Sequence, residues 1–234
     1  MPLTLEPISA SPEIARSTGN LLDGDRVDQP TFHAWYEHAP PDFRAELIGG
    51  VVSVASPVGP AHSAQDGDLI WLLGSYRIHT PGVKIYSNPT LILGVESELQ
   101  PDAVLALLPE AGGRLRRLPS GLAGAPELVL EVADSSVSRD LHQKKRDYEA
   151  AGVPEYAVVL AREGRIVWFR LRGGGYEELP PGPDGIHRSE VFPGLWLDGA
   201  ALGAENYLAA LRVLEQGLAS PEHAAFVSLL NSHV

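Results

Sequence analysis

Two hydrophobic segments of the chain each carry a single carboxylate. Residues 103–108 are aliphatic and directly follow Asp102, and residues 128–132 are aliphatic apart from Glu131. Such runs are typical of buried strands, in which alternate side chains point to opposite faces, so Glu131 shares a face with Val129. An unpaired buried carboxylate costs several kcal/mol unless a cation or hydrogen-bond donors compensate it. The two acids therefore indicate a metal site.

The rest of the pattern alternates between helix and strand. Residues 60–79 place large apolar side chains along one side of a helix, which a proline and a glycine end. Further helices are predicted at residues 31–37, capped by Thr31 or a neighbour, from Ser138 or Asp140 to residue 151, and from about residue 200 onward. Strands are predicted at residues 43–48, 51–55, 83–86, 90–93, 103–108, 127–133, 156–160 and 165–171, with a further strand near Val191.

Glycine, proline and serine mark the connections. Gly49 and Gly50 separate two strand-like runs and predict a hairpin with a two-residue turn. Residues 109–125, rich in Gly and Arg, are predicted to form an exposed loop. Residues 1–29 show no sustained period and are predicted to form a flexible N-terminal arm.

The order of elements predicts a mixed central β-sheet flanked by helices, an α/β (α+β) architecture. The chain has 234 residues, a length that one such domain with tails accommodates. We assign residues 30–204 to this domain and residues 205–234 to a C-terminal helical extension.

Composition narrows the classes of function. The formal net charge of −12 opposes indiscriminate binding to nucleic acid. The chain contains no cysteine, which excludes disulfides and thiolate metal sites and is compatible with a cytoplasmic location. We expect no secretory signal, because the N-terminus has no charged start followed by an apolar stretch. We also expect no membrane span, because no apolar run approaches the roughly 20 residues that cross a bilayer.

Basic residues are nevertheless concentrated near the candidate site. They form either a solvated loop and helix face or the basic lining of a groove. Seven of the 18 Lys and Arg residues fall in this stretch: Arg114, Arg116, Arg117, Arg139, Lys144, Lys145 and Arg146.

Several ordered motifs carry a family resemblance. The chain resembles the Uma family of bacterial restriction endonucleases in the following motifs: residues 43–50 (FRAELIGG), His62, Pro101 with Asp102, residues 128–132 (LVLEV), the spacing from Asp140 through Lys144 to Tyr148, residues 151–156 (AGVPEY) and residues 192–197 (FPGLWL). The resemblance covers roughly residues 31–202. This family is similar to the PD-(D/E)xK nuclease superfamily, whose restriction-endonuclease-like core is a mixed sheet between helices.

The resemblance implies a metal-dependent endonuclease. Asp102, Glu131 and the backbone carbonyl of Val132 would hold Mg²⁺ or Mn²⁺, and the substrate would be a phosphodiester of DNA. Hard cations prefer oxygen ligands, and Mg²⁺ usually needs only one or two protein carboxylates. Glu46 would be a third acid near the metal, and His62 would contact the phosphate or a metal ligand.

One position departs from the superfamily. A lysine usually lies two residues after the second acid, where this chain has Ala133. Lys144 on the following helix matches the position that the family retains, while Lys145 would point about 100° away. Asp140 is predicted to cap the helix that carries Lys144.

Each candidate residue also has a structural interpretation. Asp102 could end a turn, and Glu131 could lie in a solvated edge strand. Glu46 could pair across strands with Arg44 or a neighbour. His62 could cap or pack a helix, and Tyr148 is expected to pack.

Three classes of function remain open at this point. The leading one is a Mg²⁺-dependent DNA endonuclease acting as a C₂ homodimer, since a double-strand break needs two active sites. The second is a catalytically inactive interaction module with the nuclease fold. The third is a metal-dependent small-molecule phosphohydrolase, which would have a closed pocket in place of an open groove.

Overall fold

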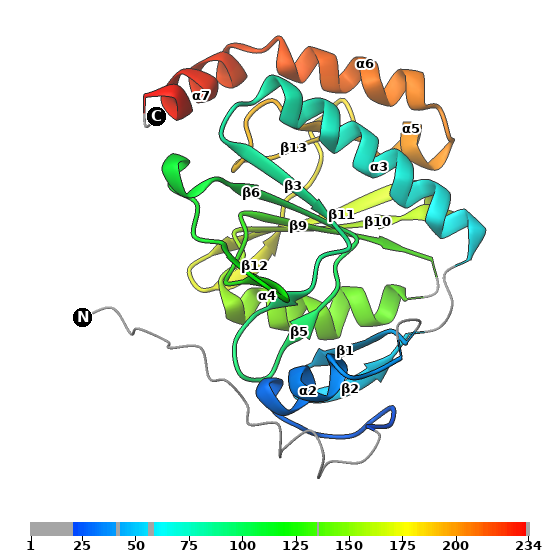
Figure 1. The fold of residues 1–234 in the computed structure, drawn as a ribbon. Helices are drawn as coiled ribbons and strands as arrows, with labels where there is room; N and C mark the ends of the chain where they lie inside the picture. Colours follow the sequence, from blue (N-terminus) through cyan, green and yellow to red (C-terminus); the bar gives the residue numbers. More distant parts are fainter. Residues whose placement is uncertain (1–20, 41–42, 56–58, 135, 233–234) are drawn as a thin grey trace.

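The computed structural model describes residues 21–40, 43–55, 59–134 and 136–232. Its centre is a six-stranded sheet with helices on both faces (Figure 1). The helices α3, α5, α6 and α7 lie on one face, and α4 lies on the other. The predicted mixed sheet flanked by helices is therefore confirmed. Strands β1 and β2 of a second sheet lie with α2 on the far side of α4.

The central sheet carries both predicted acids in its middle strands. Its order is β12-β11-β10-β9-β6-β3. The pair β9 and β10 is parallel, and the other neighbours are antiparallel. The strands are β3 (Val83–Ser87), β6 (Ala103–Leu107), β9 (Leu128–Ala133), β10 (Glu155–Leu160), β11 (Arg165–Arg172) and β12 (Gly175–Glu178).

The second sheet has the order β2-β1-β5-β4-β8-β7. Its strands are short, and only β4 and β8 pair in parallel. They are β1 (Ala45–Ile48), β2 (Val51–Val54), β4 (Leu91–Ile92), β5 (Glu98–Leu99), β7 (Arg116–Leu118) and β8 (Gly121–Ala123). A separate two-stranded ribbon joins β13 (Ile186–Arg188) to β14 (Trp196–Asp198).

The helices cover the two faces of the central sheet. They are α2 (Gln29–Tyr36), α3 (Pro60–His79), α4 (Lys145–Ala151), α5 (Gly199–Gly203), α6 (Tyr207–Leu218) and α7 (Pro221–Asn231), with 3₁₀ turns at Pro109–Ala111 and Ala161–Glu163 and a π-helix at Arg139–Lys144. Among the residues that the structure describes, no helix combines the length and the apolar character needed to cross a membrane.

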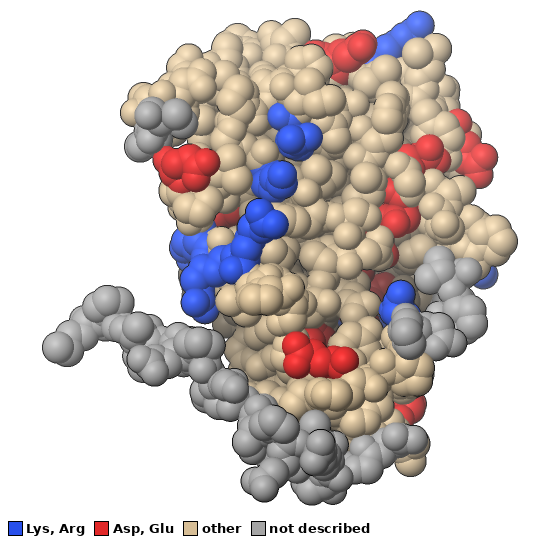
Figure 2. Space-filling view, in the orientation of Figure 1, with Lys and Arg blue, Asp and Glu red and all other residues tan. Residues whose placement is uncertain are grey.

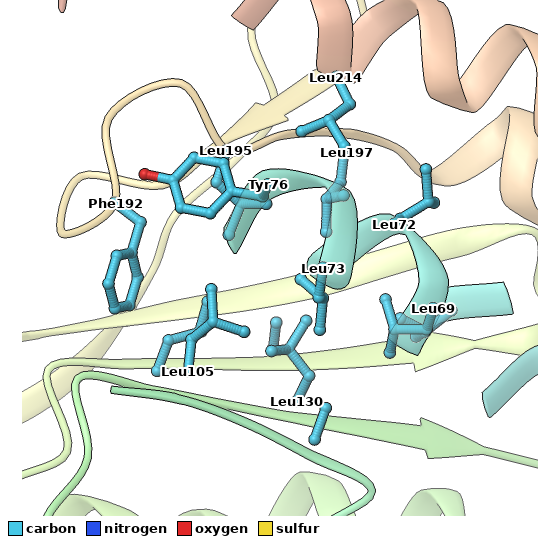
Figure 3. Close-up of a cluster of buried hydrophobic side chains, with 14 of the residues drawn as sticks. Leu69, Leu72, Leu73, Tyr76, Leu105, Leu130, Phe192, Leu195, Leu197 and Leu214 are labelled. Carbon is cyan, nitrogen blue, oxygen red and sulfur yellow. The ribbon is translucent and has the colours of Figure 1, made fainter. Parts of the chain in front are cut away.

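The larger hydrophobic core lies between α3 and the central sheet. Leu69 and Leu73 of α3 point toward the sheet, where Leu105 and Leu130 lie, and Tyr76 of the same helix lies beside Phe192 (Figure 3). Leu72 of α3 belongs to the same buried cluster, together with Leu195, Leu197 and Leu214 from the C-terminal part of the chain. The apolar stripe predicted for residues 60–79 is therefore the buried face of α3. Because α6 and α7 contribute Leu214 and Leu230 to this core, they are packed against the domain.

Strand β9 shows the predicted alternation. Leu128, Leu130 and Val132 belong to the core under α3, whereas Val129 packs in a second cluster on the α4 side. All six residues of β9 are buried, and β9 lies between β10 and β6. Glu131 is therefore in a central strand, and the solvated-edge interpretation is wrong.

The glycine hairpin is also confirmed. β1 and β2 pair from Ala45 with Val54 to Ile48 with Val51. Gly49 and Gly50 have φ values of 55° and 75°, the left-handed region that such a two-residue turn requires.

Some boundaries differ from the predictions. The cap of α2 is Asp28, whose side chain accepts a hydrogen bond from Thr31 N, so Thr31 is not the cap. Residues 109–125 are not a loop, because they contain a 3₁₀ turn and the β7–β8 hairpin. Val191 lies between β13 and β14 and is in neither strand.

The predicted N-terminal arm is described only in part. Residues 1–20 lie outside the described residues. Residues 21–28 run beside β2, where Gly24 N donates to Val52 O at 2.8 Å and Val27 N donates to Gly50 O at 3.1 Å.

Replacing Leu130 by alanine tests the core under α3. Leu130 is fully buried, so Leu130→Ala should lower the free energy of unfolding by about 2–5 kcal/mol. Leu208, which is 60% exposed, provides the control: Leu208→Ala should change it by less than about 0.5 kcal/mol. Urea denaturation followed by circular dichroism measures both, and equal effects would contradict the assigned core.

Candidate functional site

Strands β6 and β9 separate at the position of the two predicted acids. Their antiparallel ladder pairs Ala103 with Leu130, and the next pair in this register would join Asp102 to Glu131. The ladder stops before that pair. Val132 N donates a hydrogen bond to Asp102 Oδ2 at 2.6 Å, so a side-chain carboxylate replaces the main-chain acceptor. Both acids therefore lie where two central strands diverge.

Lys144 connects three acids from distant parts of the chain. Its Nζ lies 2.9 Å from Glu46 Oε1, 3.0 Å from Glu131 Oε1 and 3.9 Å from Asp140 Oδ1. Glu46 Oε1 also accepts a hydrogen bond from Gln100 N at 2.7 Å. Because Lys144 is only 4% exposed, these carboxylates replace the water that would otherwise solvate its ammonium.

A π-helix presents Lys144 to the acids. The segment Arg139–Lys144 runs directly into α4, and such widened turns recur at functional sites. The prediction that Asp140 caps this helix is wrong, because Asp140 lies within the first turn and Ser138 occupies the N-cap position. Asp140 instead accepts a hydrogen bond from Ser136 Oγ, and its main-chain oxygen accepts one from Tyr156 OH at 3.0 Å.

His62 approaches Asp102 from the first turns of α3. Its Nε2 lies 3.3 Å from Asp102 Oδ1. This hydrogen bond raises the pKa of the His62 imidazole, against an opposing effect of burial, and the nearby Asp66 carboxylate raises it further. A positive charge on His62 is therefore favoured beside Asp102.

Tyr148 is the contact that the sequence did not indicate. Its buried hydroxyl donates a hydrogen bond to Glu131 Oε1 at 2.9 Å. Its only signal in the sequence is its position one helical turn after Lys144. Lys144 also donates to Glu131 Oε1, so both contacts fall on the same oxygen of Glu131.

All of the predicted site residues line one groove. The groove has a volume of about 1380 Å³, and Tyr36, Asn88, Thr90, Gln100, Arg139 and Arg146 also contribute to its wall. The predicted residues that the structure brings together there are Glu46, His62, Asp102, Glu131, Val132 and Lys144.

Negative charge exceeds positive charge around Lys144. Burial raises the pKa of the Glu131 carboxyl well above its usual value, and the attraction of Lys144 offsets only part of this effect. Burial also raises the pKa of the Asp140 carboxyl. Burial alone would lower the pKa of the Lys144 ammonium, but Glu131, Glu46 and Asp140 raise it above its usual value. The ammonium form of Lys144 is therefore favoured, and three acids share this one cation.

The residues present suit a hard divalent cation. Among the described residues, no group of three or more His, Asp or Glu side chains is arranged as a ready metal site. Asp102, Glu131 and the Val132 carbonyl nevertheless offer oxygen ligands, and Mg²⁺ commonly takes one or two carboxylates and keeps several waters. The excess of buried carboxylates also favours a cation. The donor set therefore fits Mg²⁺ or Mn²⁺.

Comparisons with known proteins concern the fold and the family of the chain. Four chains of solved structures match the fold, among them a protein described as a "putative nuclease belonging to DUF820 from Anabaena variabilis ATCC 29413". That match has a TM-score of 0.53 at 13% sequence identity and covers 80% of this chain and 97% of the other, so it shows a shared fold. A comparison with curated proteins finds no match. Residues 29–200 match the model of the Uma2 family, described as "Putative restriction endonuclease". Because this match spans well over half of the chain, the protein belongs to the Uma2 family.

Proposed function

We propose that this protein is a metal-dependent DNA endonuclease that hydrolyses phosphodiester bonds. The observation that carries the proposal is the position of Asp102 and Glu131 at the divergence of β6 and β9, with Lys144 held against Glu131. Two acids and a lysine at the end of paired strands form a site that can hold a cation and a phosphate together. The family description supports a nuclease in general terms.

Asp102, Glu131 and the Val132 carbonyl would hold Mg²⁺ or Mn²⁺. When bound, such an ion acts as a Lewis acid and lowers the pKa of water. Tyr148 and Lys144 fix Glu131 through Oε1, and Val132 N fixes Asp102 through Oδ2. The protein thus fixes the orientation of both acids through hydrogen bonds from residues behind them, as metal sites commonly require.

Lys144 takes the place of the lysine that the superfamily usually carries where this chain has Ala133. Its ammonium lies beside Glu131 and faces the groove, where it can orient a water molecule and stabilise charge that develops on the phosphate. Glu46 of β1 also holds this ammonium, at 2.9 Å. His62, whose pKa is raised by its hydrogen bond to Asp102, is placed to contact a phosphate oxygen.

The size of the groove favours a polymeric substrate. Sites that enclose a small ligand usually measure about 300–1,000 Å³, whereas this groove is larger. The retention of two acids and a lysine in one cluster favours an active enzyme over an inactive module. We therefore rank the phosphohydrolase and the interaction module below the endonuclease. We further propose a C₂ homodimer, because paired cuts on two strands need two sites. We also propose that the protein acts in the cytoplasm.

Removing one carboxylate tests the metal site. Glu131→Gln and Asp102→Asn should each abolish the heat of Mg²⁺ or Mn²⁺ binding and lower DNA cleavage by about 100-fold or more. Calorimetry and cleavage of single- and double-stranded DNA should use the same preparations. Glu149→Gln, which removes a partly exposed acid paired with Lys145, should leave both unchanged.

The outcomes of this test separate the three classes of function. No metal binding by the wild-type protein would refute the metal site and favour the interaction module. Metal binding without cleavage of any DNA would refute the endonuclease and point to a smaller phosphorylated substrate.

Lys144→Met separates the lysine from the metal ligands. The variant should keep metal binding but lose about 100-fold in cleavage, because charge on the phosphate is no longer stabilised. It should also lose about 3–5 kcal/mol of unfolding free energy, because Glu46 and Glu131 lose their buried partner. Lys145→Met is the matched control and should show neither effect. If Lys144→Met does not fold, Lys144→Gln, which removes the charge but can still donate hydrogen bonds to the carboxylates, provides the same test of cleavage, and full activity in a folded variant would disprove this role.

As the pH is lowered, metal affinity should begin to fall at a higher pH than it would if Glu131 had the usual pKa of a glutamate. Metal binding needs the ionised carboxylate, and burial raises the pKa of Glu131, so protons compete from a higher pH downward. Calorimetry in two buffers of different ionisation enthalpy should detect protons released on binding at mildly acidic pH. The same measurement on His62→Gln removes the protons that His62 itself releases or takes up in this pH range. Affinity that stays constant until the usual range of glutamate would contradict the prediction.

A further inference from the structure

The β7–β8 hairpin presents three arginines that the proposed catalytic site does not use. Arg114 precedes β7, and Arg116 and Arg117 lie within it. All three are exposed, and β7 is the last strand of the second sheet. Figure 2 shows most of the Lys and Arg side chains of the face in view gathered in one band.

The hairpin is fixed to the body of the protein. Strand β8 pairs in parallel with β4, and Leu122 N donates to Thr90 O at 2.8 Å. At the turn, Ser120 Oγ lies 3.0 Å from His33 Nε2, and His33 Nδ1 lies 2.9 Å from the buried Glu98. The arginines therefore extend from a rigid support.

Several arginines elsewhere on the surface are already paired with acids. Arg162, Arg165, Arg172 and Arg188 each form an ion pair with an Asp or Glu. Within the described part of the chain, Arg116 and Arg117 form no such ion pair, and the charge of Arg114 acts on the buried Glu127. A guanidinium without a carboxylate partner keeps its N–H donors for a planar or tetrahedral anion.

The hairpin also continues the wall of the groove. Thr90 lines the groove and is hydrogen-bonded to β8, and two strand spacings, about 10 Å, separate β4 from β7. A duplex that leaves the groove past Thr90 would therefore meet the arginines. The arginines are suited to bind phosphate groups. The net charge of −12 repels a DNA backbone over most of the chain, so DNA binding needs a local basic surface such as this one.

We infer that this hairpin is a second DNA-contacting surface, which binds the phosphate backbone of the substrate outside the groove through Arg116 and Arg117, whose side chains project from the two faces of the edge strand β7, with Arg114 beside them. The inference rests on the proposed function and adds to it a substrate longer than the groove. Because the contacts are to phosphates, the surface contributes affinity and orientation without sequence preference.

Comparing long and short DNA tests the inference. Duplexes of about 8 and about 40 base pairs are bound to the full chain in EDTA, and anisotropy is followed over a series of salt concentrations. For the long duplex, the variant Arg116→Gln/Arg117→Gln should reduce the slope of log affinity against log salt by about 2, close to one unit per lost phosphate contact. For the short duplex, affinity in EDTA and cleavage in a separate assay with Mg²⁺ should stay those of the wild type. The control Arg165→Gln/Arg172→Gln removes the same charge from paired arginines and should keep the wild-type slope.

Each other outcome overturns a distinct statement. If the wild type binds and cleaves the long duplex but the hairpin variant matches the control, the second surface is refuted and the endonuclease stands. If the wild type neither binds nor cleaves either duplex, both proposals fail. If the variant instead loses self-association in sedimentation, the arginines bind the acidic surface of a second copy and the DNA surface is refuted.

Discussion

The buried ammonium of Lys144 is the constraint on which the arrangement of the site depends. An ammonium at 4% exposure is stable only among carboxylates, and these come from β1, β9 and the π-helix. The second sheet, the central sheet and α4 must therefore come together at one point. Asp147 strengthens the same junction, because it accepts hydrogen bonds from Gly49 N at 2.9 Å and from Ser97 Oγ at 2.7 Å. The hairpin that carries Glu46 is thus attached to the helix that carries Lys144.

Local patterns predicted what local physics determines. The alternation in residues 128–132 placed Glu131 correctly among buried neighbours, and the turn at Gly49 and Gly50 followed from backbone conformation alone. The register that places Asp102 next to Glu131 depends on pairing between strands far apart in sequence. The sequence therefore predicted that the two acids share a site, but no local pattern contained the register that brings them together.

The misses have a common cause. Strands β7 and β8 have three residues each, and two of those in β7 are exposed arginines, so no alternation marks them as strands. Their stability comes from pairing with β4, which no local window contains. The role of Tyr148 was missed for the same reason: a buried tyrosine needs an acceptor, but its partner Glu131 belongs to another element.

The move of the lysine from strand to helix has a consequence for how the chain is built. Ala133 is buried in the cluster on the α4 side, opposite Leu160 of β10, so a position that would otherwise carry charge is available for close packing of the sheet. The lysine now reaches Glu131 across 13 residues, through a helix that can vary in shape without disturbing the strand. The sheet therefore carries Asp102 and Glu131, and a separate helical segment carries the lysine. A sequence motif that requires an acid and a lysine two positions apart would therefore not match a nuclease with this arrangement.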